Sequence, residues 1–597
     1  MADVTRKPLA SLQDEHLAAS RAVENWLYAN CSDVTAVSRE EVQHIRRGLV
    51  GGWRVPLEVA SGARYIEILI PAAFPFRPPL IRLVETVDDV SWPHRERDDV
   101  LCLVPETASF DPADPVGGVV NLLNMTIELS RKVAADEADA EFRSEVLSYW
   151  THRIPADRTP IYSIVDPHPR SRAIRVWTGS SSRVIADESE ALDIWLGNRY
   201  PGLGSVKQDV GAVIWIGEAL TPAEFPITGL DVWQLAVLAG AGGLLAAAAT
   251  AARGDLVVGL GMDTANGTAI AGLVVPRPPR RQGRDMVNDG FRPGRTPHWL
   301  AAKRFFGATP VIRHEIKRVD HAWVHGRDHD SRANDLRSKT VVVVGCGSVG
   351  APAAISLAQA GVGKLIFVDP DSLNPSNISR HPLGAQYLGQ AKAEALADKL
   401  KRDLPHIVVR PLVGRIEELL LTVGDLLSNV DLVVTATGDW GAEVMLDAWH
   451  TSSGRPIPVV YGWTEAHACA GHAVAILGEG AAFREGFDPT GLPALPVTEW
   501  TATTQLQEPA CGAVYQPYGP VELQGTISVV AELALDVLLG EVSISTHRVW
   551  AGREKRLLQM GGAWSRQWLR EAGGRSDGGF LLERRWAAPI GSKALAA

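Results

Sequence analysis

Apolar residues in the C-terminal half of the chain form short, nearly continuous runs separated by helical patterns. The runs lie at residues 341–344, 365–368, 432–435 and 457–461. Runs of this kind are typical of strands buried on both faces, and the helices between them would cover a parallel sheet. The pattern therefore predicts an α/β domain with a parallel sheet over residues 336–597.

The first 155 residues have a different pattern. A helical stretch rich in Glu, Ala and Leu comes first, and residues 64–70 then place isoleucine at every second position. That period is typical of a strand with one buried face. The Phe-Pro-Phe-Arg-Pro-Pro segment at 74–79 cannot be helical, because proline lacks a backbone N–H. With a further strand at 80–84, the pattern indicates an α+β domain over residues 1–155.

Residues 156–335 form a mixed linker domain without a recognisable chemical motif. A stretch rich in Pro, Arg and Gly at 276–297 is expected to be a loop. Residues 232–252 carry no charge and are long enough to span a membrane. Ala and Gly dominate them, however, and contribute little to insertion. We expect a buried helix here, broken at 240–243, and no membrane partner.

Composition and net charge argue against some classes of protein. The 597 residues suggest about three to five domains, and a net charge of −10 argues against a nucleic-acid partner. The five cysteines are far apart, which favours a reducing cytoplasm over a disulfide framework. No signal peptide is recognised at the N-terminus. The expected location is cytoplasmic.

A glycine-rich loop follows the strand at 341–344. Gly345, Gly347 and Gly350 permit a tight turn, and the helix that follows offers free N–H groups to a phosphate. Asp369 ends the next strand, 19 residues after Gly350, where a ribose hydroxyl would bind. These residues alone fit either a dinucleotide or ATP.

The polar residues after Asp369 favour ATP. Asp371, Asn377, Arg380 and Lys392 follow within a short segment, and Asp439 comes just after the strand at 432–435. Basic side chains neutralise phosphate oxygens, and a carboxylate can hold Mg²⁺. An NAD-dependent oxidoreductase is disfavoured, because it needs one acid for the ribose and then an apolar nicotinamide pocket.

This set of motifs resembles the adenylation domain shared by ubiquitin-activating enzymes and bacterial sulfur-carrier adenylyltransferases. The similarity covers residues 340–440 and extends more loosely to about 540. It implies a Rossmann-like fold with ATP and Mg²⁺ as cofactors, and places Arg380 among the catalytic residues. The residues it implies are Asp369 and Asp371 for the ribose and nucleotide, Asn377, Arg380 and Lys392 for the phosphates, and Asp439 for magnesium.

Activating enzymes of this family carry a thioester-forming cysteine on a loop that crosses the adenylate site. Cys511 matches that position, in a Glu-Pro-Ala-Cys-Gly-Ala loop before an apolar helical run at 523–539. Cys346 fills a glycine loop that needs a small side chain, and Cys31 is expected to be structural. Cys469, between His467 and His472, is expected on a packed strand rather than in a metal site.

Cys102 would be a buried strand cysteine by periodicity alone. However, the order of helix, strand pair, Phe-Pro-x-x-Pro-Pro, His94 and Cys102-Leu resembles the ubiquitin-conjugating fold over residues 15–150. The resemblance implies that Cys102 accepts the activated carrier. Those enzymes usually have His-Pro-Asn before the cysteine, with the Asn stabilising the oxyanion. Here the order is Pro-His-Arg, so the oxyanion donor is unidentified and His94 is a candidate helper.

A conjugating domain followed by an adenylation domain resembles the fused enzymes of CBASS anti-phage operons. The resemblance implies a homodimer that activates the C-terminal tail of a cGAS-like nucleotidyltransferase. The acyl group would pass from Cys511 to Cys102 and then to a target lysine. Two alternatives stay open: a sulfur-carrier adenylyltransferase without conjugation, and a binding protein whose N-terminal domain only recognises the carrier.

Overall fold

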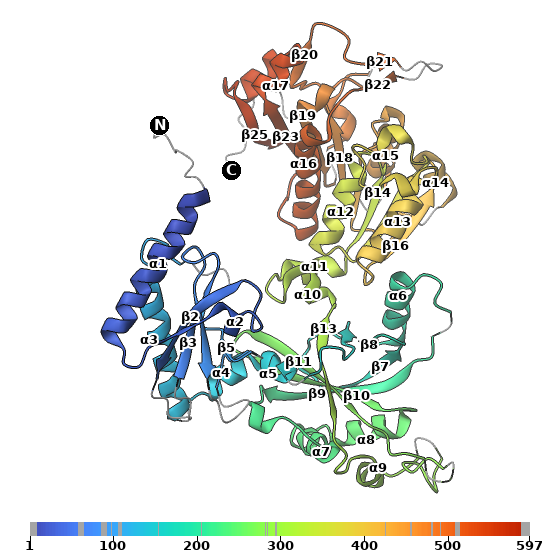
Figure 1. The fold of residues 1–597 in the computed structure, drawn as a ribbon. Helices are drawn as coiled ribbons and strands as arrows, with labels where there is room; N and C mark the ends of the chain where they lie inside the picture. The colour runs from blue at the N-terminus through green and yellow to red at the C-terminus, as the bar shows by residue number, and fades with distance from the viewer. Residues whose placement is uncertain are drawn as a thin grey trace. The chain divides into compact units, whose positions relative to one another are not determined.

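The computed structural model divides the chain into two compact units (Figure 1). One comprises Met1–Tyr162, Pro167–Ile185 and Gln208–Lys317; the other comprises Ser163–Asp166, Ala186–Lys207 and Arg318–Ala597. The structure describes residues 9–57, 65–84, 92–96, 98–104, 110–135, 137–152, 154–204, 206–280, 282, 284–292, 295–423, 426–453, 457–478, 481–489, 491–507 and 514–586.

The N-terminal part of the first unit is a five-stranded antiparallel sheet packed against helices, which confirms the predicted α+β fold. The sheet follows chain order and consists of β1 (Thr35–Val37), β2 (Leu49–Pro56), β3 (Tyr65–Pro71), β4 (Leu80–Val84) and β5 (Val100–Leu101). Helices α1 (Leu9–Asn30) and α3 (Pro115–Ala134) supply its main core (Figure 1).

The strands predicted at 64–70 and 80–84 are confirmed as β3 and β4, but the expectation of one exposed face on β3 is wrong. Ile66 and Ile68 face the α1–α3 core. Leu69 packs in a second small core beside the short helix α2 (Arg39–Val42). On that second face, Glu67 is only 2% exposed because Arg54 and Arg82 pair with it, at 2.7 and 3.0 Å.

The middle of the chain forms a second, eight-stranded sheet in the order β12-β11-β10-β9-β7-β8-β6-β13. A core cluster joins this sheet to α4 (Asp139–Ser144), α5 (Val146–His152), α7, α8 and α9 (His298–Phe305). The strands are β6 (Ile161–Ser163), β7 (Arg172–Thr178), β8 (Arg183–Ala186), β9 (Asp209–Glu218), β10 (Leu256–Thr264), β11 (Gly267–Val275), β12 (Ile312–His314) and β13 (Ile316–Arg318).

The uncharged segment 232–252 lies in two helices, α7 (Gly229–Leu238) and α8 (Gly242–Ala251). Both helices contribute to the core of the middle sheet, and the chain turns between them at Gly240, whose φ is 68°. This confirms a buried helix that is broken near 240–243. Among the helices that the structure describes, none has the length and apolarity needed to cross a membrane.

The second unit contains an eight-stranded sheet in the order β16-β15-β14-β17-β18-β19-β23-β25. The first five strands run parallel, as predicted, whereas the last three extend the sheet in antiparallel fashion. The strands are β14 (Thr340–Val344), β15 (Lys364–Asp369), β16 (Val408–Val413), β17 (Leu432–Thr435), β18 (Val459–Thr464), β19 (Ala470–Ile476), β23 (Thr546–Arg553) and β25 (Gly578–Arg585).

Helices cover both faces of this sheet, which explains why β14 is apolar throughout. Val341 and Val343 pack with α12 (Gly350–Ala360), α13 (Lys392–Asp403) and α16 (Pro520–Leu539). Val342 and Val344 pack on the other face with residues around α14 (Ile416–Thr422) and α15 (Trp440–Ser452). Each fully buried valine contributes roughly 1.5–3 kcal/mol relative to an exposed one.

Shorter elements complete the second unit, and four short strands form two antiparallel pairs outside the main sheet. Cys469, predicted to lie on a strand, instead lies directly before β19. The shorter elements are α6 (Ser189–Arg199), α10 (His321–Gly326), α11 (Arg332–Arg337), α17 (Glu554–Gln559), α18 (Arg566–Glu571), and the pairs β20 (Thr498–Trp500) with β24 (Gly562–Trp564) and β21 (Leu506–Gln507) with β22 (Val514–Tyr515).

Candidate functional site

A polar cavity of about 210 Å³ lies at the carboxyl ends of β14, β15 and β17. In this sheet the strand order reverses next to β14, which is where open α/β sheets bind ligands. Four predicted residues line the cavity: Gly345, Asp369, Asp371 and Asp439. The sequence analysis missed three further polar lining residues, Arg415, Glu417 and Thr437.

The turn from β14 into α12 requires glycine at two positions. Gly345 has a φ of +85°, and a Cβ built there would lie 2.8 Å from the carbonyl oxygen of Ala436. At Gly350 a Cβ would lie 1.9 Å from the carbonyl oxygen of Gly345. A Cβ on Gly347, by contrast, would meet no atom within 4 Å. The loop is therefore closed against the sheet at both ends and open at Gly347, as a phosphate-binding loop requires.

Asp369 holds the glycine loop in place. Its Oδ2 accepts the N–H of Cys346 at 2.6 Å, and its Oδ1 accepts the N–H of Asp371 at 2.8 Å. The side chain is buried, and this burial raises the pKa of Asp369 above its ordinary value. Each carboxylate oxygen has a second lone pair that could accept a hydroxyl, and the ribose contact of Asp369 stays a prediction.

Lys392 joins the site through Asp371. Its Nζ lies 2.9 Å from Asp371 Oδ2, and its backbone N–H donates to the Asp371 carbonyl at 2.8 Å. Arg380 stacks over Tyr518, with its guanidinium carbon 5.2 Å from the ring centre. Lys392, Arg380 and Asn377 are not among the residues that line the 210 Å³ cavity. Their phosphate contacts remain predictions.

Asp439 begins helix α15 and fits the role of a magnesium ligand. Its Oδ1 accepts the N–H of Ala442 at 3.2 Å, its side chain is 52% exposed, and it lines the same cavity as Asp369 and Asp371. Mg²⁺ usually takes one or two carboxylates and completes its shell with waters and substrate phosphates. The described residues hold no group of three or more His, Cys, Asp or Glu side chains suited to a metal.

A buried acid, missed by the sequence analysis, lies one helical turn after Asp439. Glu443 accepts a hydrogen bond from Thr437 Oγ1 at 3.2 Å, and burial raises the pKa of Glu443 to about 7. It supports Thr437, which lines the cavity. Burial therefore disfavours a negative charge on Glu443, next to the cavity-lining Thr437.

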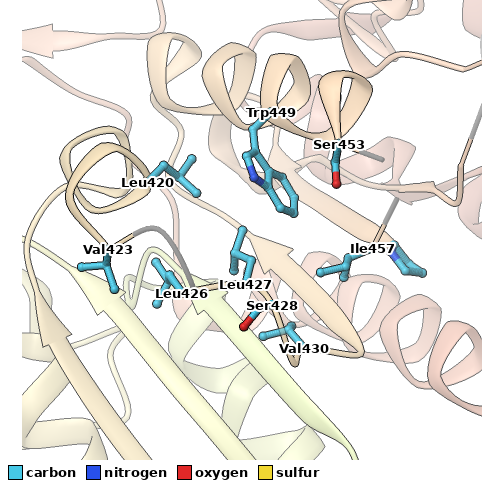
Figure 2. A pocket seen from close by; sticks show the side chains of 10 residues that line it. Leu420, Val423, Leu426, Leu427, Ser428, Val430, Trp449, Ser453 and Ile457 are labelled. Atoms are coloured by element: carbon cyan, nitrogen blue, oxygen red, sulfur yellow. The ribbon is translucent and has the colours of Figure 1, made fainter. Parts of the chain in front are cut away.

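A larger cavity of about 580 Å³ lies at the opposite ends of β17 and β18, and Figure 2 shows its lining. Leu420, Leu427, Trp449 and Ile457 surround it. Among the lining residues that the structure describes, none carries a charge. Uncharged side chains cannot neutralise phosphate, so the smaller polar cavity is the better candidate for a nucleotide site.

Cys102 lies exposed in the N-terminal domain, directly after β5. Pairing with β4 ends at Leu101, so Cys102 is not the buried strand cysteine that periodicity alone would make it. The N–H of Cys102 donates to the carbonyl of His94 at 2.7 Å, so these two residues face each other across a short hairpin. Cys102 also lines a cavity of about 510 Å³. An exposed thiol beside a cavity suits a reacting nucleophile.

The other described cysteines are less accessible. Cys346 and Cys469 are buried, and burial raises the pKa of Cys346 well above its usual value and that of Cys469 to about 11. Cys31 follows α1 and packs partly against the domain core. These positions agree with the structural roles predicted for Cys31 and Cys346.

Cys511 lies outside the described residues. The chain on either side of residues 508–513 is described and forms the pair β21–β22, with Leu506 opposite Tyr515. Tyr518 follows β22, and its hydroxyl lies 2.8 Å from Ser348 Oγ in the glycine loop. The segment after β22 therefore contacts the glycine loop.

His94 is surrounded by acids that the sequence analysis missed. Its Nδ1 lies 3.2 Å from Glu145 and its Nε2 lies 3.5 Å from Glu141. Glu145 and Glu141 raise the pKa of His94 above 6.5, although burial opposes this. Lys132 pairs with Glu141 at 2.7 Å. These contacts hold His94, and with it the hairpin, against Glu141 in α4 and Glu145 between α4 and α5.

Two known protein families match different parts of the chain. Residues 326–536 match the ThiF family, and residues 35–158 match the Prokaryotic E2 family B. This chain joins a prokaryotic E2 domain to a ThiF domain. The Cys102 site lies in the E2 domain, and the polar cavity lies in the ThiF domain.

The chain is also similar to parts of two curated proteins. The chain is 30% identical over 245 residues to the ATP-dependent ubiquitin transferase-like protein Cap2 of Pseudomonas aeruginosa, a match that covers 38% of this chain and 41% of that protein. It is 33% identical over 126 residues to the molybdopterin-synthase adenylyltransferase of Escherichia coli, covering 21% of this chain and 49% of that protein. The chain thus spans less than half the length of either relative.

Among solved structures, Escherichia coli MccB with ATP matches 37% of this chain and 63% of its own. The sequence identity is 16% and the TM-score is 0.28. This likeness is too low to bear on function.

The ion pairs of His94 predict a pH dependence of the E2 domain. A raised pKa in the folded state stabilises the fold fully below the unfolded value of 6.5, and that stability is lost as the pH rises through the folded pKa. We expect about 1 kcal/mol to be lost in this alkaline window. Thermal unfolding of wild type and His94→Gln between pH 6 and pH 9 should show the loss only in wild type. An equal slope in both proteins would contradict the role of His94.

Proposed function

We propose that this chain is an ATP-dependent activating and conjugating enzyme for a protein carrier. The observation that carries the proposal is an exposed cysteine, Cys102, in an E2 domain fused to a ThiF domain with an acid-lined cavity. A thiol acceptor and a nucleotide site in one chain suit sequential activation and transfer.

The ThiF domain would perform the adenylation. A carboxylate at the carrier C-terminus attacks the α-phosphate of ATP, forms an acyl-adenylate and releases pyrophosphate. Asp369 and Asp371 would hold the ribose and nucleotide, and Asn377, Arg380 and Lys392 the phosphates. A Mg²⁺ ion, held through Asp439, would supply positive charge that neutralises the phosphate oxygens. The glycine loop would receive phosphate at the N-terminus of α12.

The acyl group would then pass through two cysteines. The Cys511 thiolate attacks the acyl carbonyl and displaces AMP, which gives a thioester. Cys102 takes the acyl group by thioester exchange, and the amine of a target lysine finally displaces Cys102. Joining the two domains in one chain raises their effective concentration for this exchange.

The carrier we propose is the C-terminal tail of a cGAS-like nucleotidyltransferase, in an antiviral system of the CBASS type. The match to a protein named ATP-dependent ubiquitin transferase-like protein Cap2 supports this choice. We further propose a cytoplasmic homodimer, as expected from the family resemblance.

A sulfur-carrier adenylyltransferase is the second candidate, because part of the chain is also similar to the molybdopterin-synthase adenylyltransferase of Escherichia coli. Such an enzyme would pass its adenylate to a sulfur donor and would make no amide product. The fate of the acyl group after activation distinguishes the two.

Replacing Cys511 separates adenylation from thioester formation. Cys511→Ala should still form the acyl-adenylate, because the nucleotide site is intact, but should give no reducible carrier adduct at either cysteine. Non-reducing gels and nucleotide analysis measure both steps. Cys31→Ala is the matched control and should behave as wild type. A Cys102 thioester that persists in Cys511→Ala would show that Cys102 is loaded directly or that Cys469 does this work.

A further inference from the structure

Helix α5 places a tyrosine hydroxyl beside the Cys102 hairpin. Tyr149 is 5% exposed, and its oxygen accepts the backbone N–H of His94 at 2.6 Å. A phenol that accepts one hydrogen bond still has its own O–H to donate. Among the described residues, no acceptor for that hydrogen is found.

One residue connects this hydroxyl to Cys102. His94 donates its N–H to Tyr149 and accepts the N–H of Cys102 through its carbonyl, at 2.7 Å. His94 has a φ of 60°, in the left-handed region, and so the hairpin turns sharply at this point. Burial raises the pKa of Tyr149, and the charges of Glu145, Glu141 and Cys102 add to the effect. Tyr149 therefore keeps its O–H, and it contacts the same residue, His94, that binds the Cys102 backbone.

The middle domain fixes α5 in position. Trp150, the next residue, is fully buried and donates its indole N–H to the carbonyls of Gly272 and His314, at 3.1 and 3.2 Å. Its ring packs edge-on against Phe225, with centres 5.1 Å apart. A hydrogen-bond donor on so firmly packed a helix needs little reorganisation during a reaction, which is what oxyanion stabilisation requires.

We propose that the Tyr149 hydroxyl donates a hydrogen bond to the oxyanion formed during acyl transfer from Cys102. This rests on the proposed function and supplies the donor that the Pro-His-Arg sequence lacks. The target amine forms a C–N bond to the thioester carbonyl, and the carbonyl π electrons move to oxygen. Collapse of this oxyanion breaks the C–S bond, releases the Cys102 thiolate, and the amine loses its proton to water.

The test uses the full chain and a probe that does not need ATP. A glycine-terminated peptide thioester of mercaptoethanesulfonate is exchanged onto Cys102 to completion, peptide mass spectrometry confirms the position, and discharge by free lysine is timed. Tyr149→Phe should slow discharge by about 100-fold, the usual cost of one lost oxyanion donor. Tyr28→Phe, an exposed tyrosine on α1, is the matched control and should discharge as wild type.

Alkylation of Cys102 by iodoacetamide separates catalysis from structure, because alkylation forms no oxyanion. Tyr149→Phe should be alkylated at the wild-type rate across pH 6 to 9. Discharge at the wild-type rate would overturn the proposal, and so would an equal slowing of alkylation and discharge. A different outcome is that wild type fails to load with ATP while Tyr149→Phe still slows discharge of the chemically loaded protein. That result would contradict the proposed function and leave the role of Tyr149 supported.

Discussion

Replacing Cys102 with alanine is expected to abolish the dithiothreitol-resistant amide product, while the dithiothreitol-sensitive adduct on Cys511 persists. A methyl group cannot accept an acyl group, and the second cysteine of the N-terminal domain, Cys31, packs partly against the core. Burial also raises the pKa of Cys31, which disfavours its thiolate. Non-reducing and reducing gels, with peptide mass spectrometry, measure both adducts.

Two further variants sharpen this experiment. Cys102→Ser or Cys102→Lys should trap a stable ester or amide at position 102, because oxygen and nitrogen leave far less readily than sulfur. Cys31→Ala should form product as wild type does. Normal amide product from Cys102→Ala would reduce the E2 domain to a docking module and would favour the sulfur-carrier adenylyltransferase.

Loss of the Asp439 charge should reduce carrier-stimulated ATP–pyrophosphate exchange by about 100-fold, or about 2.7 kcal/mol of transition-state stabilisation. Asp439 lines the nucleotide cavity and is the proposed magnesium ligand. It also caps helix α15, so alanine would weaken the helix as well. Asp439→Asn keeps a capping oxygen and removes only the charge. Arg380→Ala should lower the exchange in the same assay by removing a phosphate partner.

The matched control for the charge is Asp403→Asn at the end of α13, where Asp403 pairs with Lys399 on the surface. This variant should exchange as wild type does. Circular dichroism should show all three variants folded. Wild-type exchange in both Asp439→Asn and Arg380→Ala would refute the assignment of the nucleotide site.

The parallel part of the ThiF sheet could be predicted because each strand is buried on both faces. Val341–Val344 contacts helices on either side, and this environment leaves a continuous apolar run in the sequence. The glycine loop could be predicted as well, because a side chain at Gly345 or Gly350 would clash with the backbone. Burial on both faces and a backbone clash each restrict the residue type at a given position, so both are visible in the sequence.

The pairing of strands that are distant in the chain could not be predicted from the sequence. β19, β23 and β25 extend the parallel sheet in antiparallel fashion, and the middle sheet joins strands that are far apart in the chain. The acids around His94 come from α4 (Glu141) and from the residue that follows it (Glu145), and Tyr149 comes from α5. A short helix carries no sign of the hairpin it will contact, so these residues could be found only from the fold.

The most direct test of the two-cysteine route is to quench the wild-type chain during turnover with carrier and map the adduct by peptide mass spectrometry. ATP is compared with its α,β-methylene analogue, which cannot release pyrophosphate. The account predicts a dithiothreitol-sensitive carrier adduct on the Cys102 peptide with ATP and none with the analogue. An amide product that forms with ATP while Cys102 never carries the acyl group would contradict it.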